Sequence, residues 1–249
     1  MDCYIIRIKG NEYSEKAAQR CFDSLKSFYP DYPFKENRVF FDAITPKDNP
    51  QKILEEYGIK NLRGFIEPYS RWDNVISAFT SHFLLWQRIK EKRKSFIFEH
   101  DAVLVDSLPL VMKKKYISDS ENSPYKLKMD IHESIRLYNI NIMNIGHPSY
   151  GKYNTPTNIG PNPLTSKRYF PGAHAYFVSS EGAKELIDVA KREAGPTDVF
   201  INYRRFPNLY EWYPWCAIAK DNFSTIQNVN GCQAKHGYNP ERYKLVQVR

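Results

Sequence analysis

Ser95-Phe96-Ile97-Phe98-Glu99-His100-Asp101 is an apolar run that ends in two carboxylates spaced i and i+2. A short run of this kind, bounded by polar residues, is typical of a buried strand. In an open α/β sheet the ligand crevice lies at the carboxyl ends of the strands, where Glu99 and Asp101 would emerge. The stretch therefore predicts a central strand and one wall of a ligand site.

The residues before this strand predict alternating strands and helices. Apolar residues 3–8 indicate a strand, and residues 11–28 have helical spacing after the capping residue Asn11. A second strand is expected over residues 38–41, and a short helix from Asn49-Pro50 to Gly58. Residues 73–90 carry one apolar stripe, which predicts a longer helix packed on the sheet.

The residues after residue 101 continue the same alternation. Strands are expected over residues 102–105, 140–145 and 175–179, and a helix begins at Ser179 or Ser180 and stops at Gly195-Pro196. Interleaved strands and helices without an internal repeat indicate an α/β fold. The length of 249 residues and the apolar fraction of 42% predict a single domain over residues 1–249.

Residues 147–171 differ from the rest, because they contain five prolines and no apolar period. A loop of this length inside a compact domain is usually functional or disordered. We expect a flexible lid that orders over a bound ligand, with a plain disordered insertion as the alternative.

Two features of the composition bear on the compartment. No run of about 18 apolar residues and no leader pattern is present, so we expect a soluble, cytoplasmic protein without a membrane span, in the host cytoplasm if it is viral. Cys3, Cys21, Cys216 and Cys232 lie far apart, which favours reduced thiols over a zinc cage or a disulfide framework.

The formal net charge of +8 favours a polyanionic partner. Nucleic acid, an anionic glycolipid surface and a nucleotide diphosphate all fit, and a lysine-rich solvated surface fits equally well. Charge alone does not choose among them.

Glu99 and Asp101 are of the type that binds a hard cation. Mg²⁺ and Mn²⁺ take carboxylate oxygens together with the oxygens of a bound phosphate. At a strand end, the pair would hold such an ion against a nucleotide diphosphate, and the ion would neutralise the leaving group as a sugar bond breaks. Acidic residues at strand ends are also common in proteins without a metal.

Six segments in order give the sequence a resemblance to glycosyltransferase family 25, which includes lipooligosaccharide galactosyltransferases and collagen galactosyltransferase domains. They are residues 41–44 (F-D-A-V in the family), 78–86 (G-C-x-x-S-H-x-x-x-W), 98–101 (L-E-D-D), 172–183 (G-x-x-A-Y-x-x-S-x-x-G-A), 196–198 (P-x-D), and 213–214 with 224–226 (Y-P and S-[ST]-I). The sequence departs from the pattern at His100, where the family has aspartate, and at Ala78 and Thr80.

The resemblance implies a GT-A type, Rossmann-like fold, a nucleotide-sugar donor, most simply a UDP-sugar, and Mn²⁺ or Mg²⁺. It also implies a hexosyl or pentosyl transfer by direct displacement, which inverts the anomeric centre. Direct displacement needs a base beside the acceptor hydroxyl, and Asp198 is the candidate. The alternative for Asp198 is an N-terminal cap or first-turn acid of a helix over residues 199–204.

The resemblance and the expected crevice together assign the site residues. The donor-binding residues are Ile6, Arg7, Ser81, His82, Glu99, His100 and His174; the metal ligands are Glu99, Asp101 and His236; the catalytic residues are Asp198 and Asp101. His82 is alternatively a packed, hydrogen-bonded helix residue, and His174 alternatively closes its loop.

The aromatic residues Tyr210, Trp212, Tyr213 and Trp215 fit two roles. Flat apolar faces suit a sugar or a base. Alternation along a strand, with Tyr210 and Trp212 on one face, favours a buried strand edge instead.

Three functions remain open from the sequence. The favoured acceptor is a hydroxymethylated pyrimidine in phage DNA, because the chain is compact and basic and residues 3–21 resemble short phage members of the family. A lipooligosaccharide or other glycan is the first alternative. A non-catalytic protein that binds nucleotide sugars or glycans is the second, since His100 replaces an aspartate.

Overall fold

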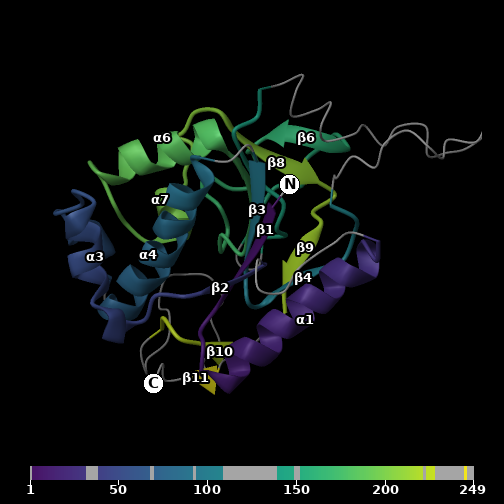
Figure 1. Ribbon diagram of the computed structural model, residues 1–249. Helices are drawn as coiled ribbons and strands as arrows, with labels where there is room; N and C mark the ends of the chain where they lie inside the picture. The colour runs from purple at the N-terminus through teal and green to yellow at the C-terminus, as the bar shows by residue number, and fades with distance from the viewer. Residues whose placement is uncertain are drawn as a thin grey trace, which may run out of the picture.

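A seven-stranded sheet forms the centre of the protein (Figure 1). The computed structural model describes residues 2–31, 39–67, 70–91, 94–108, 139–148, 152–220, 223–227 and 244–245. Within these residues the strand order is β2-β1-β3-β7-β5-β8-β6. The strands are β1 Asp2–Arg7, β2 Phe40–Asp42, β3 Lys94–Glu99, β5 Ile142–Asn144, β6 Gly160–Pro163, β7 Ala175–Ser179 and β8 Leu209–Tyr213.

The sheet is mixed in direction. β2, β1 and β3 are parallel neighbours, as are β5 and β8, whereas β7 runs antiparallel to both β3 and β5. β6 is an antiparallel edge strand on β8. The carboxyl ends of β2, β1 and β3 therefore meet at one edge of the sheet.

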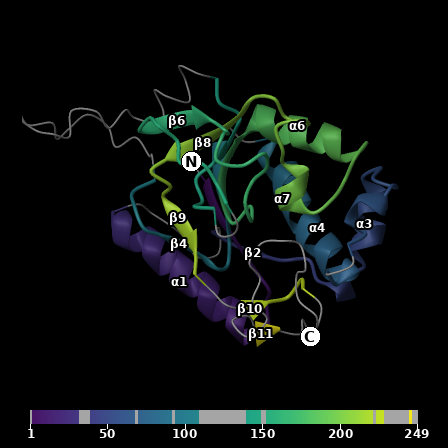
Figure 2. The same ribbon diagram turned by 180° about the vertical axis from the view of Figure 1, so that it is seen from behind.

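Helices cover both faces of the sheet (Figures 1 and 2). One face carries α3 Pro50–Glu56, α4 Trp72–Ile89, α6 Ser180–Ala190 and the short α7 Thr197–Phe200. The other face carries α1 Glu12–Phe28 together with a small antiparallel sheet of β4 Ala102–Leu104 and β9 Ala217–Ala219. Short 3-10 turns, η1 Pro46–Asp48 and η2 Arg63–Phe65, flank α3, and β10 Phe223–Ser224 pairs with β11 Lys244–Leu245.

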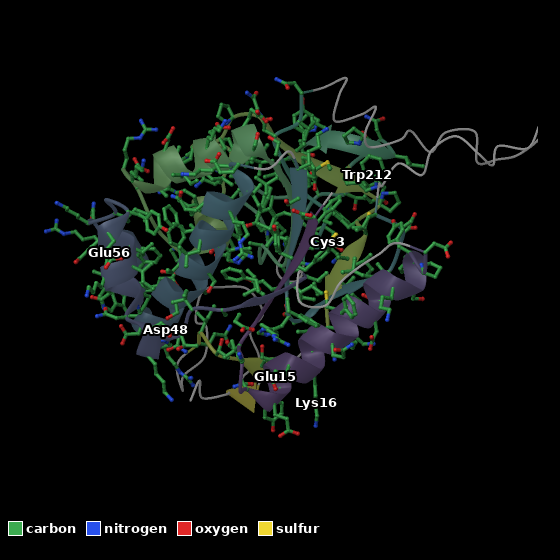
Figure 3. All side chains as sticks on the ribbon, in the orientation of Figure 1. Cys3, Glu15, Lys16, Asp48, Glu56 and Trp212 are labelled. Carbon is green, nitrogen blue, oxygen red and sulfur yellow. The ribbon has the colours of Figure 1, made fainter. Side chains whose placement is uncertain are left out.

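Alternation along the strands divides the apolar core into two clusters. Tyr4 and Ile6 of β1 face α4 and α6, whereas Cys3 and Ile5 face α1. Successive side chains of a strand point to opposite faces, so one strand supplies both clusters. Figure 3 shows Cys3 in the interior, while Lys16 of α1 and Glu56 of α3 lie at the periphery.

The expected elements are present within a few residues of their predicted bounds. Asn11 caps α1 by accepting from the Ser14 amide, and Ser179 caps α6 by accepting from the Gly182 amide. The helix expected over residues 199–204 is wrong in its bounds, because α7 spans Thr197–Phe200 and the chain then turns around Asn202. The mixed α/β architecture with one central sheet is confirmed.

The predicted lid over residues 147–171 contains ordered structure that its composition did not suggest. Residues 160–163 form β6, and the Phe170 side chain is fully buried against the core. Glu211 of β8, also fully buried, accepts hydrogen bonds from the amides of Thr165 and Ser166, both at 2.8 Å. Residues 149–151 lie outside the described residues, and closure of this segment over a ligand stays a prediction.

The predicted alternation along β8 is confirmed. Tyr210 and Trp212 pack against the cluster beneath α1, and Glu211 lies on the opposite face. In the part of the chain that the structure describes, no helix is both long and apolar enough to cross a membrane.

Candidate functional site

A cleft of about 180 Å³ lies where β1, β2 and β3 end. Ile6 of β1 pairs with Phe41 of β2 on one side and with Glu99 of β3 on the other, so the three strand ends are in register. The cleft is lined by Ile6, Ile8, Ala43, Ile44, Thr45, Pro46, Asn74, Ser77, Ala78, Ser81, His82, Glu99, His100, Asp101, Phe223, Ser224, Thr225 and Ile226. Ile6, Ser81, His82, Glu99, His100 and Asp101 are thus brought together as the sequence predicts.

Glu99 stands at the border between the cleft and the core. Its side chain is 30% exposed, and its Oε1 lies 3.1 Å from Nε2 of His82, which is 1% exposed. Burial raises the pKa of Glu99 to about 7; the electrostatic interaction with His100 opposes this shift, and the interaction with Asp198 adds to it. Glu99 is therefore poised to change its charge near neutral pH when no cation is bound.

A buried chain of hydrogen bonds fixes His82 behind Glu99. Nδ1 of His82 lies 2.9 Å from the Tyr176 hydroxyl, to which Nε1 of Trp86 donates at 2.9 Å. An indole N–H only donates, so the Tyr176 oxygen accepts from Trp86 and its hydrogen is left for His82. The proton of His82 is then assigned to Nε2, where it points at Glu99.

The protonation state of His82 agrees with this assignment. Burial lowers the pKa of His82 to about 3, so the ring is neutral at physiological pH. A neutral imidazole has one donor nitrogen and one acceptor nitrogen, which is what Glu99 and Tyr176 require. This geometry fits the packed, hydrogen-bonded alternative for His82; its side chain also lines the cleft, and donor binding by it stays a prediction.

Ser81 joins α4 to the loop after β2. Its Oγ accepts from the Ile44 amide at 2.9 Å and donates to the Ser77 carbonyl at 2.9 Å. Residues 43–46, which line the cleft, are therefore held against the helix.

His100 is held from two sides. Its Nδ1 lies 3.0 Å from Oγ of Ser14, which follows the cap of α1. Its ring stacks on Phe223, with centroids 5.1 Å apart and an angle of 14° between the planes. The Asp101 carbonyl accepts from the Lys220 amide at 3.0 Å, which anchors the turn that carries both residues.

Residues 223–227 form the outer wall of the cleft. The Arg71 amide donates to the Ile226 carbonyl, and Nδ2 of Asn74 donates to the Thr225 carbonyl, both at 2.6 Å. These contacts tie the C-terminal part of the chain to the start of α4, about 150 residues earlier, so the wall is fixed by the helix that also carries His82.

Arg7 and His174, both predicted to bind the donor, do not line the cleft. Nε of Arg7 forms an ion pair with Asp42 at 2.9 Å across β1 and β2. The His174 ring is 2% exposed and packs on Gly146, where an added Cβ would lie 2.5 Å from Nε2. Burial lowers the pKa of His174, and this position fits the alternative in which His174 closes its loop.

Asp198 lies in the first turn of α7, outside the cleft lining. Its Oδ1 accepts from the Val199 amide at 2.8 Å, and residue 196, not Asp198, is the cap. Asp198 is nevertheless close enough for its charge to influence the pKa values of both His82 and Glu99. The base and first-turn roles both remain compatible with this placement.

A divalent cation fits the residues that the cleft presents. His236 lies outside the described residues, and among the described ones no group of three or more His, Cys, Asp or Glu side chains forms a ready metal cage. Mg²⁺, however, is usually held by one or two carboxylates plus substrate phosphates and water. Glu99 and Asp101 line the same cleft, and none of its described lining residues is a lysine or arginine.

Tyr176 and Trp86 are not among the site residues predicted from the sequence. His82 and Trp86 are spaced i and i+4, so they share one face of α4. Two polar-tipped aromatic groups on that face need buried partners. The spacing of His82 and Trp86 could have indicated a buried hydrogen-bond partner, but only the fold identifies that partner as Tyr176.

Most of the chain matches the model of a known protein family. Residues 1–201 match the model of a family described as glycosyltransferase family 25 (LPS biosynthesis protein). No curated protein is similar enough in sequence to be matched. The matched region contains β1 to α7, and hence Glu99, Asp101 and Asp198, but ends before Tyr213-Pro214 and residues 224–226.

Proposed function

The chain belongs to glycosyltransferase family 25, and from this premise we propose that it transfers a sugar from a nucleotide diphosphate, most simply UDP, to a hydroxyl of a saccharide. The observation that carries the proposal is the cleft at the ends of β1, β2 and β3 with Glu99 and Asp101 on its wall. Ligands of open α/β sheets bind at this edge. The arrangement, a mainly parallel sheet with β7 and the edge strand β6 antiparallel, supports a GT-A type fold.

The charge of the cleft supports a requirement for Mn²⁺ or Mg²⁺. The described lining has carboxylates but neither lysine nor arginine, so a diphosphate there would be repelled without an added cation. Glu99 and Asp101 would hold the ion, with His100 and His236 as further candidates. When bound, the cation supplies charge neutralisation for the leaving diphosphate.

Other residues of the cleft would position the donor, and Asp198, outside the cleft lining, would act on the acceptor. Ile6, Ala43 and Ile44 offer an apolar wall for the nucleotide base, and His82 donates to Glu99 from the rigid helix α4. Asp198 is the proposed base that takes the proton of the acceptor hydroxyl in a direct, inverting displacement.

DNA that carries hydroxymethylated pyrimidines is the second candidate acceptor. The observation in its favour is the net charge of +8. The family description names LPS biosynthesis, which favours a saccharide and makes it the first choice here.

Thermal unfolding against nucleotides and nucleotide sugars, with and without Mn²⁺, tests the donor site. A ligand at about 100 times its Kd adds roughly 2.7 kcal/mol to the free energy of unfolding. We expect stabilisation by one nucleotide, dependent on Mn²⁺ and removed by Asp101→Asn but retained in Lys60→Ala, which changes an exposed residue beyond α3. Absence of stabilisation by every nucleotide with Mn²⁺ present would contradict the proposal.

A further inference from the structure

Two hollows on the side of α7 join into one groove outside the cleft. They have volumes of about 670 and 490 Å³ and share Arg168, Tyr169 and Tyr203. Figure 2 shows this side of the molecule, with α7 beside α4 and α6. We name it the basic groove after its described cationic lining residues, Lys152, Lys167, Arg168, Arg192, Arg204 and Arg205.

The backbone fixes the two strips of chain that form the floor of the basic groove. Tyr169 and Asn202 form an antiparallel bridge, and the Tyr203 amide donates to the Arg168 carbonyl at 3.1 Å. Oδ1 of Asn202 accepts from the amides of Arg204 and Arg205 at 3.0 and 3.2 Å. Arg168 and Arg204 therefore lie on two neighbouring segments whose backbones are hydrogen-bonded to each other.

Positive charge in the groove is only partly compensated. Arg205 forms an ion pair with Glu193 at 2.9 Å. Arg168, Arg192 and Arg204 are exposed and form no ion pair in the part of the chain that the structure describes. Hydrogen bonding by Arg204 and the charge of Arg168 lower the pKa of the exposed Tyr203, which locates the excess of cations around that ring.

The groove matches a phosphorylated saccharide in chemistry and size. A guanidinium presents a fork of N–H donors that suits phosphate oxygens. Tyr169 and Tyr203 belong to the lining of both hollows, and aromatic rings offer flat faces for sugar rings. A volume of about 670 Å³ is typical of a site for a compact ligand, whereas a DNA duplex is bound across a broad surface.

The groove also reaches α7. Val199, the residue after Asp198, belongs to its lining. A ligand in the groove would therefore approach the start of α7, the element that carries the proposed base.

We propose that the basic groove binds phosphate groups of the acceptor saccharide, with Arg168 and Arg204 as the main contacts and Tyr169 and Tyr203 against its sugar rings. This inference rests on the proposed glycosyltransfer to a saccharide. It identifies the acceptor class as a phosphate-bearing saccharide and separates acceptor binding from donor binding in the cleft.

The test compares binding of three probes to the full chain by calorimetry. They are a delipidated lipopolysaccharide core oligosaccharide with its phosphates, the same oligosaccharide after phosphatase treatment, and a hydroxymethylated DNA duplex. We expect the phosphorylated oligosaccharide to bind at least tenfold more tightly than the dephosphorylated one. The double variant Arg168→Ala/Arg204→Ala should remove this difference, and Lys52→Ala/Lys60→Ala, of equal charge change on the exposed α3 region, should retain it.

Three outcomes would overturn the inference. They are equal binding of the two oligosaccharides, equal losses in the two double variants, and tighter binding of the duplex with loss in Arg168→Ala/Arg204→Ala. Nucleotide stabilisation with Mn²⁺ is measured on the same variants. If nucleotide still stabilises the protein while any of these three outcomes is observed, the donor site is intact and only the proposal for the groove is refuted. If nucleotide does not stabilise the unmodified chain, the proposed function itself is contradicted.

Discussion

The cleft at the end of β3 and the basic groove beside α7 hold their charged groups in opposite ways. In the cleft, Glu99 is backed by His82 and Tyr176, both nearly or fully buried, so its position is fixed by the core. In the groove, Arg168 and Arg204 are exposed side chains on two hydrogen-bonded segments of chain. The cleft is acidic and rigid, and the groove is basic and adaptable.

The two arrangements indicate what each region is suited to do. Stabilising a developing charge requires groups that are already in place, because their reorganisation then costs nothing during the reaction. Binding the phosphates of a branched ligand tolerates movable cations, each of which contributes modestly. Substitutions in the cleft should therefore change turnover, and substitutions in the groove should change affinity for the acceptor.

Asp101→Ala is the strongest test of this division. Loss of one of the two carboxylates that line the cleft proposed for the diphosphate should lower kcat by at least about 100-fold, since such interactions act mainly in the transition state. Single-turnover kinetics with saturating acceptor measures the effect, and circular dichroism checks folding. A loss below tenfold, or an equal loss in Lys60→Ala, would show that the cleft is not where the chemistry occurs.

Tyr176→Phe tests whether the core holds the cleft. The change leaves the indole N–H of Trp86 and Nδ1 of His82 without their buried partner. Each such group costs about 1–3 kcal/mol, so for the two groups we expect a loss of about 2–6 kcal/mol in the free energy of unfolding by urea. Tyr153→Phe is the control, because its hydroxyl contacts His147 at 3.2 Å in an exposed setting; equal losses would contradict a special role for the buried chain.

The sequence predicted the cleft better than the groove for a physical reason. Strand ends and the carboxylates on them follow from local apolar patterns, and parallel strand ends converge by geometry. Glu99, Asp101 and Ser81 could thus be placed together in advance. Arg168, Arg192 and Arg204 are scattered along the chain, and only the bridge between Tyr169 and Asn202 brings two of their segments into one surface.

Other features depended on contacts that no local pattern encodes. The antiparallel direction of β7 is not written in its apolar run, which would suit either direction. Tyr176 meets His82 across 94 residues of chain. The end of α7 was misplaced because a four-residue helix has too few turns to show a period.

Gly64→Ala tests whether the close approach of Gly64 to Ala194, just before α7, contributes to stability. A Cβ at Gly64 would lie 2.1 Å from the Ala194 carbonyl oxygen, whereas a Cβ at Gly195, on the other side of the same contact, would lie 3.4 Å from the Gly64 oxygen. Overpacking of this kind costs about 1–3 kcal/mol. Gly64→Ala should lose that much in urea unfolding and Gly195→Ala little; comparable losses would show that the contact yields.

Glu99→Gln should change how the free energy of unfolding of the protein depends on pH. A carboxyl whose pKa is about 7 when folded but near 4.5 when unfolded binds more protons in the folded state between those values. Glu99 therefore adds stability as the pH falls through this window, and His82, with its pKa lowered to about 3, removes stability below about pH 6.5.

Without Glu99, nothing opposes the stability that His82 removes on acidification. From pH 7.5 to 5.5, with chelator present, Glu99→Gln should therefore lose roughly 1 kcal/mol more free energy of unfolding than the unmodified chain does. This figure is reduced because the carboxylate is partly exposed. Urea unfolding across this range measures the difference, with the exposed Glu56→Gln as control. Parallel pH profiles for Glu99→Gln and the unmodified chain would mean that the core does not tune this carboxylate.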